Sequence, residues 1–158
     1  MIKKILFVCL DNICRSPAAE AVLLNRLKQK KLENQYEVDS AGTGGWHIGR
    51  LADSRMRMAA KQRGIEIESK ARQIALSDFT YFDLILTMDD SNLADVNALL
   101  KELDTSPKSK IKPLLSYARN TQLIEVPDPY YGGDSGFDQV LDLLEDAIDG
   151  LLIEIDKS

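Results

Sequence analysis

Hydrophobic residues along the chain form two kinds of pattern: short apolar or alternating runs, and longer segments in which they recur every three or four positions. The strand-like segments are 5–8, 36–41 and 82–88. The helix-like segments are 17–31, 54–60, 93–103 and 137–155. Residues 111–115 indicate a last strand, although Pro113 counts against it because proline cannot donate to a sheet ladder. Strands that alternate with helices predict an α/β fold with a parallel sheet covered on both faces, and such sheets bind ligands at the carboxyl ends of their strands.

The composition is that of a single globular domain over residues 1–158, with 44% hydrophobic and 28% charged residues. No apolar run is long enough to span a bilayer, and the first residues lack the pattern of a secretory signal. We therefore expect a cytoplasmic protein without a membrane partner. The formal net charge of −5 argues against nucleic acid as a partner, because phosphate backbones attract clustered Lys and Arg.

Metal ligands are few in this sequence. It has a single histidine, His47, and its two cysteines lie in one short segment. Asp89 and Asp90 follow a predicted strand and resemble a metal-binding carboxylate pair, but capping of the next helix explains at least one of them more simply. We therefore do not expect a zinc site.

The candidate chemistry lies in the segment Cys9–Pro17, which links the first strand to the first helix. Pro17 suits the first helical position with Ser16 as the cap, so backbone N–H groups of this turn can point at an anion. The helix dipole, these N–H groups and Arg15 all favour the thiolate form of Cys9. Arg15 offers a planar fork that matches two phosphate oxygens. Together these groups predict nucleophilic attack on a phosphoryl group.

Taken singly, these residues have simpler explanations, since free cysteine is usually a small buried hydrophobe and arginine a surface charge. Their joint arrangement is more specific. A cysteine, five residues, an arginine and then a serine, placed between a strand and a helix, resemble the signature loop of cysteine-dependent phosphatases. In that superfamily the serine stabilises the thiolate, a role that the resemblance gives to Ser16.

An acid that protonates the leaving oxygen would complete this chemistry. Asp128 is a candidate, because it lies between Pro127 and Pro129 and precedes two aromatic residues, Tyr130 and Tyr131. A rigid turn explains the same segment, and the two interpretations are compatible. Trp46, in a glycine-flanked loop, is explained equally by packing and by a place in a cleft.

Further motifs narrow the resemblance from a superfamily to a family. They are the loop near the N-terminus, Ser40-Ala41-Gly42-Thr43, Ala71-Arg72-Gln73, Thr87-Met88-Asp89 and Asp128-Pro129-Tyr130-Tyr131. In this order and at this length the chain resembles the low-molecular-weight protein tyrosine phosphatases. The resemblance implies a four-stranded parallel sheet flanked by helices, no metal or cofactor, and two-step hydrolysis of phosphotyrosine in proteins or of small aryl phosphates.

The same resemblance implies roles for single residues. Cys9 would be the nucleophile, Arg15 would bind the phosphate, and Asp128 would act first as acid and then as base. The other residues expected at the substrate are the loop residues Leu10, Asp11, Asn12, Ile13, Cys14 and Ser16, with Trp46, Tyr130 and Tyr131 along an aromatic slot. Asn12 would hold the shape of the loop, and Cys14 would pair with Cys9 on oxidation and release it on reduction.

Two positions depart from the family pattern. Asp11 stands where the family usually has glycine; aspartate tolerates a left-handed backbone better than most residues, so we expect the loop to form. A carboxylate near a bound phosphate repels it, so we expect the side chain to turn outward and the activity to be weakened. Ser69 stands where family members often have a histidine that supports the loop asparagine, which leaves the support of Asn12 open.

Two other functions remain open at this point. A thiol-dependent arsenate reductase uses a similar loop, but it generally needs further cysteines downstream, and none follows Cys14. A phosphotyrosine-binding module without turnover is suggested only by Asp11, and it would need neither a nucleophile nor an acid. For the oligomeric state we expect a monomer or a weak dimer.

Overall fold

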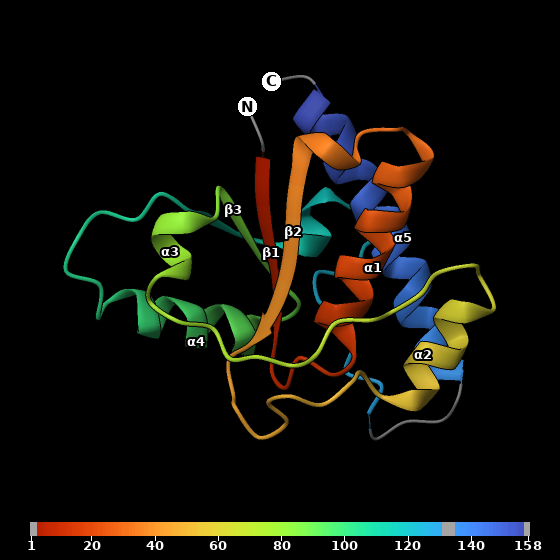
Figure 1. The fold of residues 1–158 in the computed structure, drawn as a ribbon, viewed down its shortest axis with the longest axis horizontal. Coiled ribbons are helices and arrows are strands. Elements are labelled where there is room, and N and C mark those ends of the chain that lie inside the picture. The colour runs from red at the N-terminus through yellow and green to blue at the C-terminus, as the bar shows by residue number, and fades with distance from the viewer. Residues whose placement is uncertain (1–2, 131–134, 157–158) are drawn as a thin grey trace.

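A computed structural model describes residues 3–130 and 135–156, and it contains a four-stranded parallel sheet in the order β2-β1-β3-β4 (Figure 1). The strands are β1 (Lys3–Cys9), β2 (Tyr36–Gly42), β3 (Leu84–Thr87) and β4 (Lys110–Pro113). The α-helices are α1 (Arg15–Gln29), α2 (Ser54–Lys61), α3 (Asp78–Tyr81), α4 (Asp90–Leu100) and α5 (Ser135–Asp156). Two short 3₁₀ helices are η1 (Glu33–Gln35) and η2 (Leu114–Tyr117). The predicted α/β fold with four parallel strands is confirmed.

Helices cover both faces of the sheet, as the alternating sequence pattern predicts. Figure 1 shows α1, α2 and α5 on one side of the strands and α3 and α4 on the other. Successive residues of a strand face opposite sides, so Ile5 and Phe7 pack under α1 and α5, whereas Leu6 and Val8 pack on the side of α3 and α4. Because both faces are buried, β1 is apolar from Ile5 onward rather than alternating.

Two local predictions need correction or comment. Helix α1 begins at Arg15, with Cys14 at the N-cap, so the predicted start at Pro17 with Ser16 as the cap is wrong. The Ser16 hydroxyl bonds within the loop instead of capping the helix. The strand that Pro113 called into question is present: Pro113 is the last residue of β4, an edge strand, where its missing N–H costs little.

The sheet order places the candidate loop beside the end of β3. Strands β1 and β3 are parallel neighbours, with Val8 opposite Thr87, so the segments that follow them emerge at the same edge. On the other side of β1, Gly42 ends β2 against the loop; a Cβ there would lie only 2.7 Å from the Leu10 carbonyl oxygen. Glycine at this position therefore lets β2 approach the loop closely. None of the described helices has the length and apolar character needed to cross a membrane.

Candidate active site

The loop between β1 and α1 is held by its surroundings through three backbone carbonyls. Those of Cys9 and Leu10 accept hydrogen bonds from the N–H groups of Thr43 (2.9 Å) and Gly44 (2.8 Å). That of Ile13 accepts from the N–H of Asp53 at 2.7 Å. Because these carbonyl oxygens bond to neighbouring segments, they point away from the centre of the loop. An anion site requires this, because carbonyl oxygens directed at the anion would repel it.

Asn12 bends the loop and is fully bonded. Its φ of 58° is in the left-handed region, which asparagine tolerates better than most residues. Its Nδ2 donates to the hydroxyls of Ser16 (2.7 Å) and Ser40 (3.0 Å), and its Oδ1 accepts from the backbone N–H of Arg72 at 3.0 Å. The left-handed residue of the loop is therefore Asn12, and Asp11 does not adopt a positive φ.

The hydrogen bonds of Asn12 continue to a buried carboxyl group on α1. The Ser40 hydroxyl donates to Glu20 at 2.6 Å, and Ser69 also hydrogen-bonds the Glu20 side chain. Burial raises the pKa of Glu20, and the hydrogen bond from Ser40 only partly offsets this. Ser69 thus supports Asn12 indirectly, through Glu20 and Ser40.

Cys9 and Cys14 are both buried free thiols in this loop. The sulfur of Cys9 lies 3.0 Å from the Ser16 hydroxyl oxygen, which can donate a hydrogen bond to a thiolate. Burial strongly raises the pKa of the Cys14 thiol, and the negative charge of Asp53 adds to the effect. Cys14 is therefore neutral at physiological pH.

Arg15 is a buried cation held at the first residue of α1. Its Nη1 donates to Oδ2 of Asp89 at 2.7 Å and to the carbonyl of Val126 at 2.9 Å. Burial alone lowers the pKa of Arg15, but the charges of Cys9 and Asp89 outweigh it, and the net pKa lies above the ordinary value. The guanidinium is therefore charged and oriented, as bidentate binding of a phosphate requires.

Asp128 and Cys9 line one cavity, although they are 119 positions apart in the sequence. Its Oδ2 is 3.7 Å from Nη2 of Arg15, and its Oδ1 accepts from the backbone N–H of Tyr130 at 3.0 Å. Arg55 of α2 donates to the Tyr130 carbonyl at 3.0 Å and lies over the Tyr130 ring. These hydrogen bonds thus hold the turn at residues 128–130, and with it the Asp128 carboxylate, beside the cysteine loop.

One small cavity brings most of the predicted residues together. It is lined by Cys9, Asp11, Ile13, Cys14, Arg15, Asp128 and Tyr130. Leu10 and Trp46 instead line a neighbouring pocket, and Trp46 is 71% exposed. Asn12 and Ser16 lie behind the loop as its supports, and Tyr131 falls outside the described residues.

Asp11 borders the cavity with its side chain partly exposed. Its Oδ2 lies 4.0 Å from Nε2 of His47, in the segment after β2. The carboxylate therefore faces this segment while the residue still lines the cavity that Cys9 and Arg15 share. Its effect on phosphate binding stays a prediction.

Some residues that shape the site could not be recognised, or not fully, from the sequence pattern. Asp89 caps α4 by accepting from the N–H of Asn92 at 2.8 Å, as predicted, but its other oxygen also binds Arg15. Its place at the carboxyl end of a strand was the available signal. Nothing in the sequence pattern pointed to Glu20 or Arg55. Among the described residues, no group of three or more His, Cys, Asp or Glu side chains is arranged to hold a metal ion.

A cysteine and a buried arginine at the two ends of a strand-to-helix loop, with an aspartate beside them, define the class of cysteine-dependent phosphatases. Residues 4–158 match the family model of the low molecular weight phosphotyrosine protein phosphatases. The human low molecular weight phosphotyrosine protein phosphatase is 47% identical over 138 residues, which cover 87% of this chain and 86% of the human protein. The chain belongs to this family.

Solved structures agree with this assignment. A protein tyrosine phosphatase from Entamoeba histolytica, crystallised with Hepes in the active site, superposes with a TM-score of 0.91 at 45% identity and covers 98% of this chain and 97% of its own. The Drosophila arginine phosphatase reaches the same TM-score, 0.91, at 34% identity, covering 96% of this chain and 97% of its own. The fold is thus shared by enzymes whose names record different phosphorylated side chains.

Proposed function

We propose that this chain hydrolyses the phosphate ester of phosphotyrosine side chains, and of small aryl phosphates, through a phosphocysteine intermediate on Cys9. One observation carries the proposal: Cys9, Arg15 and Asp128 line a single small cavity at the carboxyl edge of the sheet. A nucleophile, a fixed cation and an acid around one cavity are the groups that phosphoryl transfer requires.

In the first step the Cys9 thiolate attacks phosphorus, so that a P–S bond forms and the P–O bond to the phenol oxygen breaks. Asp128, as the carboxylic acid, donates its proton to that oxygen, and the product leaves as a neutral phenol. Arg15 stabilises the charge on the non-bridging phosphoryl oxygens. Its bonds to Asp89 and Val126 hold the guanidinium in place while this charge develops.

In the second step Asp128, now a carboxylate, accepts a proton from a water molecule. The oxygen of this water attacks phosphorus, the P–S bond breaks, and inorganic phosphate and the Cys9 thiolate are released. The Ser16 hydroxyl, 3.0 Å from the sulfur, stabilises the thiolate as it leaves. Asp128 regains its acid form, so the cycle needs only water and no cofactor.

Tyr130 supports a preference for an aromatic ester, because this aromatic residue lines the same cavity as Cys9. A phosphoserine side chain is shorter, and its phosphate would stop short of the cysteine. The named activity of the Drosophila relative makes phosphoarginine the appropriate competitor. We expect phosphotyrosine peptides to be hydrolysed faster than matched phosphoserine or phosphoarginine peptides.

Initial rates on these three peptides and on phenyl phosphate test the function. Cys9→Ser should abolish turnover, and a rapid acid quench should reveal a phosphate on Cys9 by mass spectrometry. Binding of the phosphotyrosine peptide without turnover would instead favour a binding module. Thiol-dependent reduction of arsenate without ester hydrolysis would favour the reductase.

We also propose that the chain acts in the cytoplasm as a monomer or weak dimer on tyrosine-phosphorylated proteins. A catalytic thiol with a second cysteine in the same loop stays reduced in that compartment. Sedimentation of the reduced protein over a range of concentrations tests the oligomeric state.

A further inference from the structure

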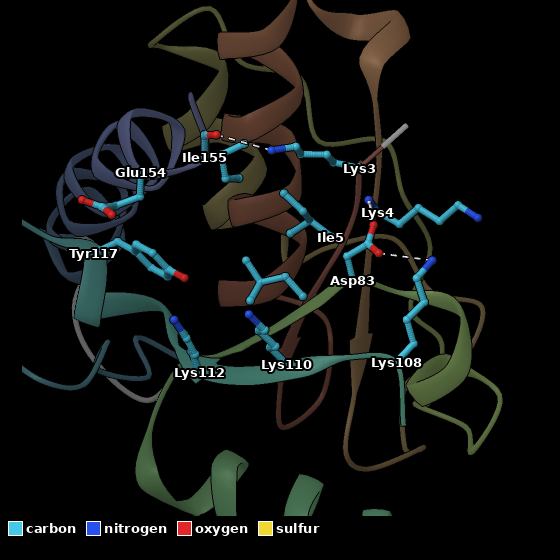
Figure 2. Close-up of a pocket in the computed structure, with 11 residues that line it drawn as sticks. Lys3, Lys4, Ile5, Asp83, Lys108, Lys110, Lys112, Tyr117, Glu154 and Ile155 are labelled. Atoms are coloured by element: carbon cyan, nitrogen blue, oxygen red, sulfur yellow. Dashed lines mark hydrogen bonds and ion pairs between the residues drawn. The ribbon is translucent and has the colours of Figure 1, made fainter. Parts of the chain in front are cut away.

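A second hollow lies at the opposite end of the sheet from the cysteine loop, where β1, β3 and β4 begin (Figure 2). Its volume is about 850 Å³, within the range of small-molecule sites. Its lining comprises Lys3, Lys4, Ile5, Asp83, Leu84, Lys108, Lys110, Lys112, Tyr117, Glu154 and Ile155. Lys3 and Cys9 are six residues apart on β1, so the two sites are separated by about 20 Å.

The charge of this hollow is opposite to that of the chain as a whole. Five lysines and two carboxylates line it, whereas the formal net charge of the protein is −5. Asp83 already pairs with Lys108 at 3.1 Å, and the Lys4 ammonium lies 4.1 Å from the centre of the Tyr81 ring. Figure 2 shows the Glu154 carboxylate pointing away from the hollow. The positive charge is therefore not cancelled locally.

Lys110 and Lys112 direct their ammonium groups from β4 toward α5 (Figure 2). They are two positions apart on β4, so both project from one face of the strand, whereas the Lys3 ammonium points toward the Ile155 carbonyl (Figure 2). Neither Lys110 nor Lys112 forms an ion pair with any described residue. Lys3 makes one long hydrogen bond, 3.4 Å to the Ile155 carbonyl, and keeps other N–H donors.

Apolar groups form the other part of the lining. Ile5 is almost fully buried at the base, and the half-buried side chains of Leu84, Tyr117 and Ile155 surround it. The Lys112 ammonium is 5.8 Å from the centre of the Tyr117 ring, so one cation lies where polar and apolar surfaces meet. Lysines on an edge strand also discourage strand pairing between molecules, but that role needs no apolar hollow beside them.

We propose that this hollow binds a small organic phosphate, with its apolar or aromatic body against Leu84, Tyr117 and Ile155 and its phosphate beside Lys110 and Lys112. Two ammonium groups on one face of a strand match a phosphate, which carries close to two negative charges at neutral pH, better than a single carboxylate. Lysine suits a phosphate as a point charge without fixed geometry. Nucleoside monophosphates and aryl phosphates share this chemistry.

Backbone amide NMR distinguishes this site from the catalytic one, because each has its own signals. Titration with phenylphosphonate, which is not hydrolysed, should shift the signals of Leu84, Lys110 and Tyr117 as well as those of the cysteine loop. The first set should still shift in Arg15→Ala, in which phosphate binding at the cysteine loop is removed. Adenosine monophosphate tests the nucleoside source, while inorganic phosphate and hexanoate each lack one half of the ligand and should bind at least several-fold more weakly.

Charge reversal provides the matched comparison. Lys110→Glu with Lys112→Glu should weaken phenylphosphonate binding at this site by about tenfold or more, because two exposed attractions become repulsions. Lys28→Glu with Lys30→Glu, the same charge change at the end of α1, should leave it unchanged. Lys110→Gln with Lys112→Gln serves if the reversed variant is unfolded. Shifts confined to the cysteine loop, or equal affinities in all variants, would overturn the proposal.

Discussion

The guanidinium of Arg15 donates to the carboxylate of Asp89 at 2.7 Å, and this contact joins the first residue of α1 to the end of β3. Arg15 is 3% exposed and Asp89 22%, so water screens the pair only weakly. The other oxygen of Asp89 caps α4. One side chain thus anchors a helix and fixes the direction of the phosphate-binding cation.

Asp89→Asn should lower kcat/KM for phenyl phosphate by about tenfold or more, because small misplacements of a binding group reduce turnover strongly. Asparagine is a good N-cap, so the melting temperature should change little. Steady-state kinetics and thermal unfolding measure the two effects separately. Asp90→Asn, at a neighbouring residue for which the structure gives no Arg15 contact, is the control. A fall in melting temperature with unchanged kcat/KM would show that Asp89 serves only the fold.

Asp128→Asn should reduce kcat for phenyl phosphate by about 10²–10⁴-fold, the usual contribution of a general acid. The loss should be smaller for p-nitrophenyl phosphate, because its phenolate leaves more readily without a proton. Rates for a series of substituted phenyl phosphates measure this change in leaving-group dependence. Glu125→Gln, in the same segment, should retain the wild-type dependence. An identical loss for every leaving group would remove Asp128 from the role of acid.

Asp11→Gly and Asp11→Asn should each lower the KM for phenyl phosphate and strengthen inhibition by inorganic phosphate. A full charge at about 4 Å from phosphate opposes binding by ~4 kcal/mol at an effective dielectric of 20, and partial exposure reduces this, so a gain of up to about tenfold is expected. Any effect of His47→Ala on binding should be absent in Asp11→Gly, because the imidazole lies 4.0 Å from the Asp11 carboxylate and would act through it. An unchanged KM in both Asp11 variants would show that this carboxylate does not inhibit.

Features that depend on one continuous stretch of sequence were predicted, whereas features that depend on contacts in the folded chain were not. The cysteine loop is one continuous segment. Apolar residues occupy both faces of β1 and one face of α5, so these elements could be predicted directly from the sequence. The start of α1 could not be predicted in this way. In the folded loop the Ser16 hydroxyl bonds Asn12 and Cys9 rather than the end of the helix, and these contacts form only when the loop is folded.

Contacts between distant residues were the least predictable. The pairing of Arg15 with Asp89 depends on β3 lying next to β1, and no residue pattern specifies this order. Trp46 lines a pocket beside the cavity, and its contact with substrate stays a prediction, because local propensity does not determine the course of a glycine-rich segment. The sequence pattern places Glu20 on the polar face of an amphipathic helix. In the structure β2 positions Ser40 against Glu20, and the two side chains form a hydrogen bond.

Glu20→Gln should stabilise the protein at neutral pH, because burial raises the pKa of Glu20 and its charged form is disfavoured in the folded state. An acid whose folded pKa is raised loses stability as the pH rises from the unfolded pKa, about 4.3 for glutamate, through the folded pKa. The advantage of Glu20→Gln in melting temperature should therefore be absent at acidic pH, grow through this interval and then level off. Glu33→Gln, at an exposed position, should show no such trend. A constant difference at every pH would contradict the argument.

Cys14→Ser should leave phenyl phosphate turnover within about twofold of the natural chain, because the Cys14 thiol is neutral and has no part in the proposed steps. Its response to hydrogen peroxide should differ. In the natural chain oxidised Cys9 can condense with Cys14 to a disulfide, and dithiothreitol should restore activity. Without Cys14, Cys9 should proceed to sulfinic and sulfonic acids, and dithiothreitol should recover little. Activity after timed peroxide exposure and reduction, with the mass of the Cys9 peptide, measures this; equal recovery in both proteins would exclude a protective disulfide.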